Sequence, residues 1–122
     1  MNISIIGTGY VGLVTGVCLA EMGHNVHCID INKEKIENLN KGVIPIYEPG
    51  LDELVSKNVQ AKKLFFTSDY SVIEFSEAVF SAVGTPSDKD GSADLQYVEA
   101  VAKEFAKDIK KQPGGYITYT SI

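Results

Sequence analysis

The sequence contains no arginine and no tryptophan among its 122 residues, so lysine supplies all eleven basic side chains. Without a guanidinium group, the chain has no bidentate clamp for a phosphate or a carboxylate. Any bound phosphate must be held by backbone N–H groups, by lysine or by another part of a longer protein. The formal net charge is −5, and basic residues cluster only at Lys62-Lys63 and Lys110-Lys111. These features argue against nucleic acid as a partner.

Long apolar runs are also missing. No stretch approaches the length that spans a membrane, and no basic segment precedes a cleavable apolar segment at the N-terminus. We therefore expect a cytoplasmic protein with no membrane partner. The two cysteines, Cys18 and Cys28, match no metal-binding spacing. We expect two buried, reduced thiols and no metal site, with a disulfide or a nucleophilic thiol as the alternatives.

The remaining pattern alternates short apolar runs with helical periodicity over a length that suits one domain. Strands are expected at residues 2–6, 25–30, 64–67, 78–83 and 116–120, and helices at 10–22, 33–41, 51–57, after 69 and at 95–110. This alternation predicts an α/β fold: a Rossmann-type, doubly wound parallel sheet in the order 3-2-1-4-5 with helices on both faces. The first helix is expected to face the sheet with Val11, Val14, Thr15, Cys18, Leu19 and Met22.

A glycine-rich turn, Gly7-Thr8-Gly9-Tyr10-Val11-Gly12, joins the first strand to the first helix. In such a turn Gly7 allows the sharp reversal, Gly9 lets the backbone approach a pyrophosphate, and Gly12 lets the helix pack closely on the strand. The free N–H groups of the helix N-terminus then face the phosphates. The alternative is a packing turn that binds no ligand.

Asp30 closes the second strand, 18 positions after Gly12, where an acidic residue accepts hydrogen bonds from a ribose diol. A 2′-phosphate beside this carboxylate would meet a repulsion of about 4 kcal/mol at ~4 Å and an effective dielectric near 20. The sequence therefore favours NAD over NADP as the cofactor. FAD, which shares the glycine fingerprint, is the weaker alternative.

Ligands of doubly wound sheets bind beyond the carboxyl ends of the strands, where the winding reverses. This rule places the glycine turn beside Val83-Gly84-Thr85-Pro86, which ends the fourth strand. We therefore expect Gly7–Gly12 and Val83–Pro86 to meet over one cofactor. Within the fourth strand, Ser81 needs a backbone partner for its hydroxyl if it is buried.

Together with the glycine turn and Asp30, three segments resemble the NAD-binding domain of the nucleotide-sugar 6-dehydrogenases, the family of UDP-glucose 6-dehydrogenase. They are Pro45-Ile46-Tyr47-Glu48-Pro49-Gly50-Leu51, Val83-Gly84-Thr85-Pro86 and Gly91-Ser92-Ala93-Asp94-Leu95. The resemblance implies an enzyme that oxidises a sugar 6-hydroxyl to a carboxylate with two NAD.

The resemblance also implies cofactor contacts at Val11, Asp30, Lys35 and Thr85. In the family, the fifth strand ends in a Ser-Thr pair on the nicotinamide side. Thr120 and Ser121 are the best match, although Tyr119 replaces the preceding lysine of the family.

The same resemblance places the catalytic cysteine and its supporting residues in later domains, so no catalytic residue is assigned here. We expect residues 1–122 to be a cofactor-binding fragment whose full-length form takes a UDP-sugar and forms a homodimer. A relative acting on a UDP-N-acetylhexosamine or GDP-mannose, and a non-catalytic dinucleotide-binding module, are the alternatives.

The loop around Tyr47-Glu48-Pro49 has two interpretations. It covers the sheet edge as an ordered loop, which we favour, or it lies at an active-site entrance or a domain interface. Glu48 shows no partner in the sequence that would make it a general base.

Overall fold

A five-stranded parallel sheet forms the centre of the computed structural model, which describes residues 1–83, 99, 103 and 118–121. The strand order is β3-β2-β1-β4-β5, with β1 in the middle, so the predicted fold class and strand order are confirmed. The strands are β1 (Asn2–Ile6), β2 (Asn25–Ile29), β3 (Leu64–Thr67), β4 (Ala78–Ser81) and β5 (Thr118–Ser121). The helices are α1 (Tyr10–Glu21), α2 (Lys33–Asn40), α3 (Leu51–Gln60) and the 3₁₀ helix η1 (Tyr70–Phe75).

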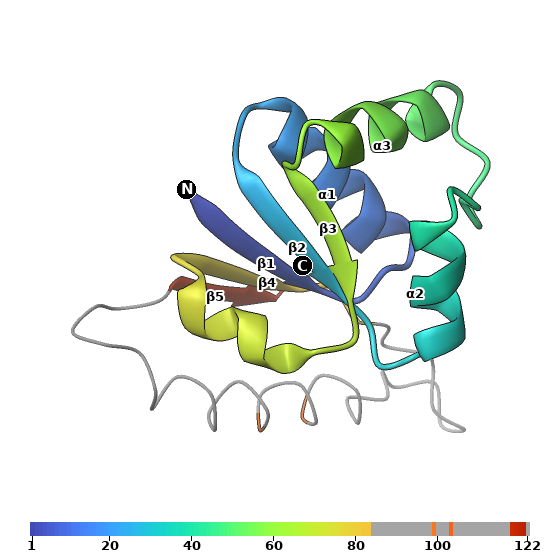
Figure 1. Cartoon of the computed structure of the whole chain (residues 1–122). Coiled ribbons are helices and arrows are strands. Elements are labelled where there is room, and N and C mark those ends of the chain that lie inside the picture. The colour runs from blue at the N-terminus through green and yellow to red at the C-terminus, as the bar shows by residue number, and fades with distance from the viewer. Residues whose placement is uncertain (84–98, 100–102, 104–117, 122) are drawn as a thin grey trace.

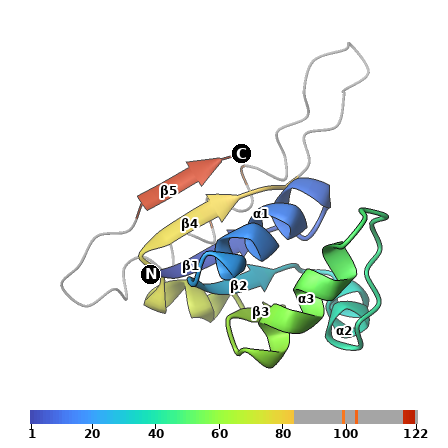
Figure 2. The ribbon, with the colours of Figure 1, turned by 90° about the horizontal axis from the view of Figure 1, so that it is seen from above.

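Helical segments cover both faces of the sheet (Figures 1 and 2). The helices α1 and α3 lie over one face and η1 lies under the other. The larger hydrophobic cluster joins Ile5 of β1 to residues of α1, α2 and α3. A smaller cluster of Ile6, Ile29, Ile73 and Val79 lies on the η1 side. Successive residues of β1 thus enter opposite clusters, as the period-2 geometry of a strand requires.

Element boundaries differ by a few residues from those expected. The helix α3 runs three residues beyond the predicted end at Lys57, and β4 ends at Ser81 rather than at Val83. The predicted helix at 95–110 lies outside the described residues, apart from Glu99 and Lys103, which are helical and exposed.

The face that α1 turns to the sheet is one residue away from the predicted stripe. Its buried residues are Gly12, Leu13, Gly16, Val17 and Ala20. The prediction was wrong for Val11, Cys18 and Met22, which are exposed, whereas Val14 and Leu19 do pack against the larger cluster. Because α1 is apolar on nearly every side, large side chains did not mark its buried face. Close packing selected small residues instead: a Cβ on Gly16 would lie 2.6 Å from the Cys28 sulfur.

The two cysteines have different environments, contrary to the expectation that both are buried. Cys28 is completely buried in β2, and burial raises the pKa of its thiol to about 12. Cys18 is exposed, near the C-terminal end of α1. Both thiols are free, as expected.

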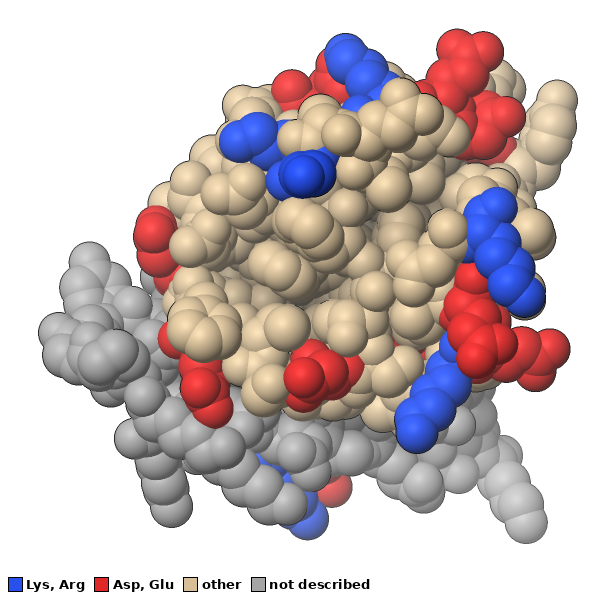
Figure 3. Space-filling view, viewed as in Figure 1, with Lys and Arg blue, Asp and Glu red and all other residues tan. Residues whose placement is uncertain are grey.

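The helix α3 is tied to the C-terminal end of α1 by polar contacts on Glu21. Lys57 Nζ lies 2.6 Å from Glu21 Oε1, and Asn58 donates a hydrogen bond of 2.9 Å to Oε2. These contacts lower the pKa of Glu21, with the lysine hydrogen bond as the largest cause. On the face shown in Figure 3, the described residues carry charges of both signs around the margin, and their basic side chains form no continuous surface.

Three serines are buried on the η1 side of the molecule, but only two of them pair. The hydroxyl groups of Ser4 and Ser76 share a hydrogen bond. Ser81 is fully buried, and its hydroxyl has no hydrogen-bond partner within the described part of the chain. The expectation that a buried Ser81 would find a backbone partner was therefore wrong.

Because Ser4 has a hydrogen-bond partner and Ser81 has none among the described residues, alanine substitutions at the two positions should affect stability differently. Ser4→Ala should lower the free energy of unfolding by about 1–2 kcal/mol, because it leaves the buried Ser76 hydroxyl without its serine partner. Ser81→Ala should leave the free energy of unfolding unchanged or raise it, because the hydroxyl that it removes has no partner to lose. Urea unfolding of both variants measures this difference. A loss at Ser81 as large as that at Ser4 would contradict the assignment.

Candidate functional site

The sharp turn after β1 depends on Gly7. Its φ angle is +105°, in the region that favours glycine, and a Cβ there would lie 2.6 Å from the Ala82 carbonyl oxygen. The Gly7 N–H donates a hydrogen bond of 2.7 Å to the Ile29 carbonyl. Gly7 therefore holds the ends of β1, β2 and β4 together at one edge of the sheet.

The other two glycines of the turn have different tasks. A Cβ on Gly12 would collide with the carbonyl oxygen of Gly7, so this glycine permits the close contact between α1 and the turn. A Cβ on Gly9 would meet no atom within 4 Å. Packing within the chain thus accounts for Gly7 and Gly12, while Gly9 opens to the outside, where a ligand can reach the backbone.

The N-terminus of α1 carries no cap of its own. Gly9 occupies the N-cap position without a side-chain hydrogen bond, and the first turn of α1 contains no acidic residue. In contrast, Asn32 caps α2 through a hydrogen bond from the Lys35 N–H, and the first turn of α3 contains acidic residues. The unpaired N–H groups and the positive end of the α1 dipole therefore make this helix end a candidate site for an anion.

The carboxylate of Asp30 is fastened to the glycine turn. Its Oδ2 accepts hydrogen bonds from the Thr8 N–H, at 3.1 Å, and from the Thr8 hydroxyl, at 2.7 Å. Its Oδ1 accepts one from the Asn32 N–H at 2.9 Å. Because two carboxylate oxygens offer about four acceptor positions, Asp30 keeps acceptor capacity for a ligand. Sequence analysis missed the role of Thr8, which is fully buried and serves Asp30.

Lys35, for which the resemblance implies a cofactor contact, lies beside Asp30. Its Nζ is 4.0 Å from Asp30 Oδ2, and its side chain is 35% exposed. The structure thus brings together the glycine turn, Asp30 and Lys35 at the carboxyl end of the sheet. The glycine turn presents free N–H groups, Asp30 a carboxylate and Lys35 an ammonium group.

The loop between α2 and α3 reaches the glycine turn as well. The Tyr10 hydroxyl donates a hydrogen bond of 2.9 Å to Glu48 Oε2. This bond and the charge of Glu48 raise the pKa of Tyr10. Sequence analysis found no partner for Glu48, because 38 positions separate the two residues and neither belongs to a local motif. The loop therefore lies beside the candidate site and does more than cover the sheet edge.

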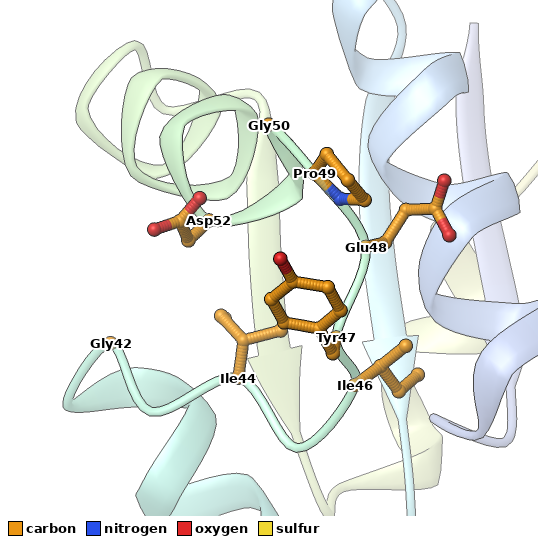
Figure 4. A pocket seen from close by; sticks show the side chains of 8 residues that line it. All are labelled: Gly42, Ile44, Ile46, Tyr47, Glu48, Pro49, Gly50 and Asp52. Atoms are coloured by element: carbon orange, nitrogen blue, oxygen red, sulfur yellow. The ribbon is translucent and has the colours of Figure 1, made fainter.

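The same loop borders a hollow of about 310 Å³ (Figure 4), lined by Gly42, Ile44, Ile46, Tyr47, Glu48, Pro49, Gly50 and Asp52. Tyr47 is 94% exposed. The Glu48 side chain turns from the loop toward α1, whereas Asp52 lies on the α3 side. Glu48 thus lines the hollow and also reaches the first residue of α1.

The fourth-strand part of the predicted site is described only in part. Val83 is half-buried and packs against the smaller hydrophobic cluster. Gly84, Thr85 and Pro86 lie outside the described residues. Ser121 belongs to β5, paired in register with Ser81.

Within residues 1–83, 99, 103 and 118–121, every helix is too short or too polar to span a membrane. The described part of the chain also contains no group of acidic, histidine and cysteine side chains that could hold a metal ion.

Comparison with known proteins agrees with this geometry. Residues 1–120 match the family model described as the UDP-glucose/GDP-mannose dehydrogenase family, NAD binding domain. The chain is 55% identical over 109 residues to the UDP-glucose 6-dehydrogenase TuaD of Bacillus subtilis, covering 88% of this chain and 24% of the relative.

Solved structures show the same relationship. GDP-mannose dehydrogenase from Pseudomonas aeruginosa is 39% identical with a TM-score of 0.92, covering 99% of this chain and 28% of that protein. The UDP-N-acetyl-mannosamine dehydrogenase Cap5O from Staphylococcus aureus is 30% identical with a TM-score of 0.86, covering 99% of this chain and 29% of that protein.

The chain thus spans about a quarter of the length of these relatives. The glycine turn, the uncapped α1 and Asp30 occur together in a chain that matches the family model almost from end to end. The chain therefore belongs to the UDP-glucose/GDP-mannose dehydrogenase family and corresponds to its NAD-binding domain.

Proposed function

We propose that the chain binds NAD as the cofactor domain of a UDP-glucose 6-dehydrogenase, which oxidises UDP-glucose to UDP-glucuronate. The observation that carries the NAD site is the uncapped N-terminus of α1, open at Gly9 and flanked by Asp30. UDP-glucose as substrate is supported by the 55% identity to the Bacillus subtilis UDP-glucose 6-dehydrogenase. Oxidation of an alcohol to a carboxylate removes two hydrides, so each turnover consumes two NAD.

Within this chain, the N–H groups at the start of α1 hold the pyrophosphate. Asp30 accepts hydrogen bonds from the adenosine ribose, and Lys35 lies close enough to reach the ribose or a phosphate. The Asp30 carboxylate and the lack of arginine disfavour the 2′-phosphate of NADP. NAD would supply the hydride acceptor, and we propose that Val83, Gly84, Thr85, Pro86 and Ser121 would contribute further contacts to it.

The groups that handle the sugar belong to the rest of the full-length protein. Neither cysteine here suits a nucleophile: Cys28 is buried with a raised pKa, and Cys18 lies toward the far end of α1 from the glycine turn. The full-length protein is proposed to act as a cytoplasmic homodimer that takes the UDP-sugar between its domains. Free thiols fit a reducing compartment.

A second candidate substrate class follows from the solved structures. Enzymes for GDP-mannose and UDP-N-acetyl-mannosamine share this domain with TM-scores of 0.92 and 0.86. The cofactor site is the same under either proposal, so the substrate is decided by residues beyond this domain.

Gly9→Val should abolish NADH binding while leaving the domain folded. The valine side chain meets no atom of the protein within 4 Å of its Cβ but occupies the approach to the α1 N-terminus. NADH fluorescence titration measures the binding, and circular dichroism checks the fold. Ser56→Val on the exposed face of α3 is the matched control and should bind NADH normally. Unchanged titration of Gly9→Val would remove the pyrophosphate assignment.

Asp30→Ala should weaken NADH binding by about 1.5–3 kcal/mol, the scale of hydrogen bonds to a charged group, and should narrow the preference over NADPH. Thr8→Val is the comparison, since it removes one bond to Asp30 and keeps the carboxylate. It should lose less affinity and keep the preference for NADH. Equal affinity of Asp30→Ala and wild type for both cofactors would show that Asp30 does not contact the ribose.

The purified chain should bind NADH without oxidising UDP-glucose, because the sugar-handling groups are proposed to lie elsewhere. Absorbance at the NADH band measures turnover, with a full-length UDP-glucose 6-dehydrogenase as the positive control. Turnover of UDP-glucose by the 122 residues alone would refute the assignment of catalysis to later domains.

A further inference from the structure

The hydrogen bond between Tyr10 and Glu48 holds a carboxylate one tyrosine side chain away from the helix end that the proposed function requires to be open. Tyr10 is the first residue of α1, immediately after Gly9. Helical side chains lean toward the N-terminus of their helix. The Glu48 carboxylate, bonded to the Tyr10 hydroxyl at 2.9 Å, is therefore held near this end of α1 at the length of a tyrosine side chain.

The backbone of Glu48 is positioned independently of Tyr10. Ile44 and Ile46 of the same loop pack against the larger hydrophobic cluster. The Leu51 N–H donates a hydrogen bond of 3.1 Å to the Glu48 carbonyl. Among the described contacts, the bond to Tyr10 holds the carboxylate of Glu48 but not its backbone. Loss of that bond would free the side chain while the loop stays in place.

A free carboxylate near an uncapped helix N-terminus is attracted to it. Side-chain oxygens take this role elsewhere in the chain, at Asn32 for α2 and at Asp69 for η1. The start of α1 has neither a cap nor an acid in its first turn. Glu48 and a pyrophosphate are thus two anions that can compete for the same N–H groups.

We propose that Tyr10 is a positioning residue that holds Glu48 away from the N-terminus of α1, so that the pyrophosphate of NAD binds there. This inference rests on the proposed function. It adds that a carboxylate of the chain itself competes with the pyrophosphate for the N-terminus of α1. The Tyr10 hydroxyl does not need to touch the dinucleotide; it acts through the carboxylate that it restrains.

Four NADH titrations of the purified chain test the inference. Tyr10→Phe, which releases the carboxylate, should weaken binding by about two- to fivefold, the scale of a charge at a helix terminus. Glu48→Gln, which removes the charge, should bind NADH at least as tightly as wild type. The double variant should recover the affinity that Tyr10→Phe loses, because the competing anion is gone.

A purely structural role for this contact gives the opposite pattern. If Tyr10 and Glu48 only fasten the loop, both single variants bind more weakly and the double variant does not recover, which overturns the inference. Asp52→Asn removes a carboxylate on the α3 side of the hollow and should leave NADH affinity unchanged. Urea midpoints separate lost binding from lost folding.

If Tyr10→Phe does not fold, Glu48→Gln alone decides: equal or tighter NADH binding supports the inference, and weaker binding overturns it. Failure of the wild-type chain to bind NADH would instead remove the proposed function itself. The two failures are therefore distinguishable in one set of titrations.

Discussion

The close approach of α1 to the sheet is the constraint on which the rest of the structure depends. Gly7, Gly12 and Gly16 each stand where a Cβ would press into a neighbour: the Ala82 carbonyl, the Gly7 carbonyl and the Cys28 sulfur. This contact seats the start of α1 directly over the ends of β1 and β4. An anion bound there lies at the point where the winding of the sheet reverses. The packing requirement and the binding requirement thus meet in a single turn.

The remaining site residues attach to that turn by hydrogen bonds. Asp30 is joined to Thr8, and Lys35 lies beside Asp30, so the end of β2 and the start of α2 follow the position of the turn. Glu48 reaches it from the other side through Tyr10. Elements far apart in the sequence are in this way brought to one edge of the sheet, which explains why a domain without arginine can present an organised anion site.

Much of this arrangement follows from local sequence signals. The strand order, the glycine turn and the position of Asp30 were predictable, because short apolar runs alternate with helical patterns along the chain and the glycines mark the turn after the first strand. The buried face of α1 was not, because a helix apolar on nearly all sides gives no direction to its stripe. The unpaired Ser81 hydroxyl and the Tyr10–Glu48 bond depend on contacts between segments, and single-sequence patterns carry no signal for either.

The bonds between Asp30 and Thr8 have a consequence for any change of cofactor. Under the proposed function, the Asp30 carboxylate repels a 2′-phosphate, so replacing Asp30 is the obvious route toward NADP. The same replacement removes the carboxylate that accepts hydrogen bonds from the buried Thr8 hydroxyl and from the Thr8 N–H. It therefore also loosens the turn that is proposed to hold the pyrophosphate. Cofactor preference and the conformation of the glycine turn therefore depend on the same carboxylate. A redesign toward NADP must supply a new hydrogen-bond acceptor for Thr8 as well as a positive charge for the 2′-phosphate.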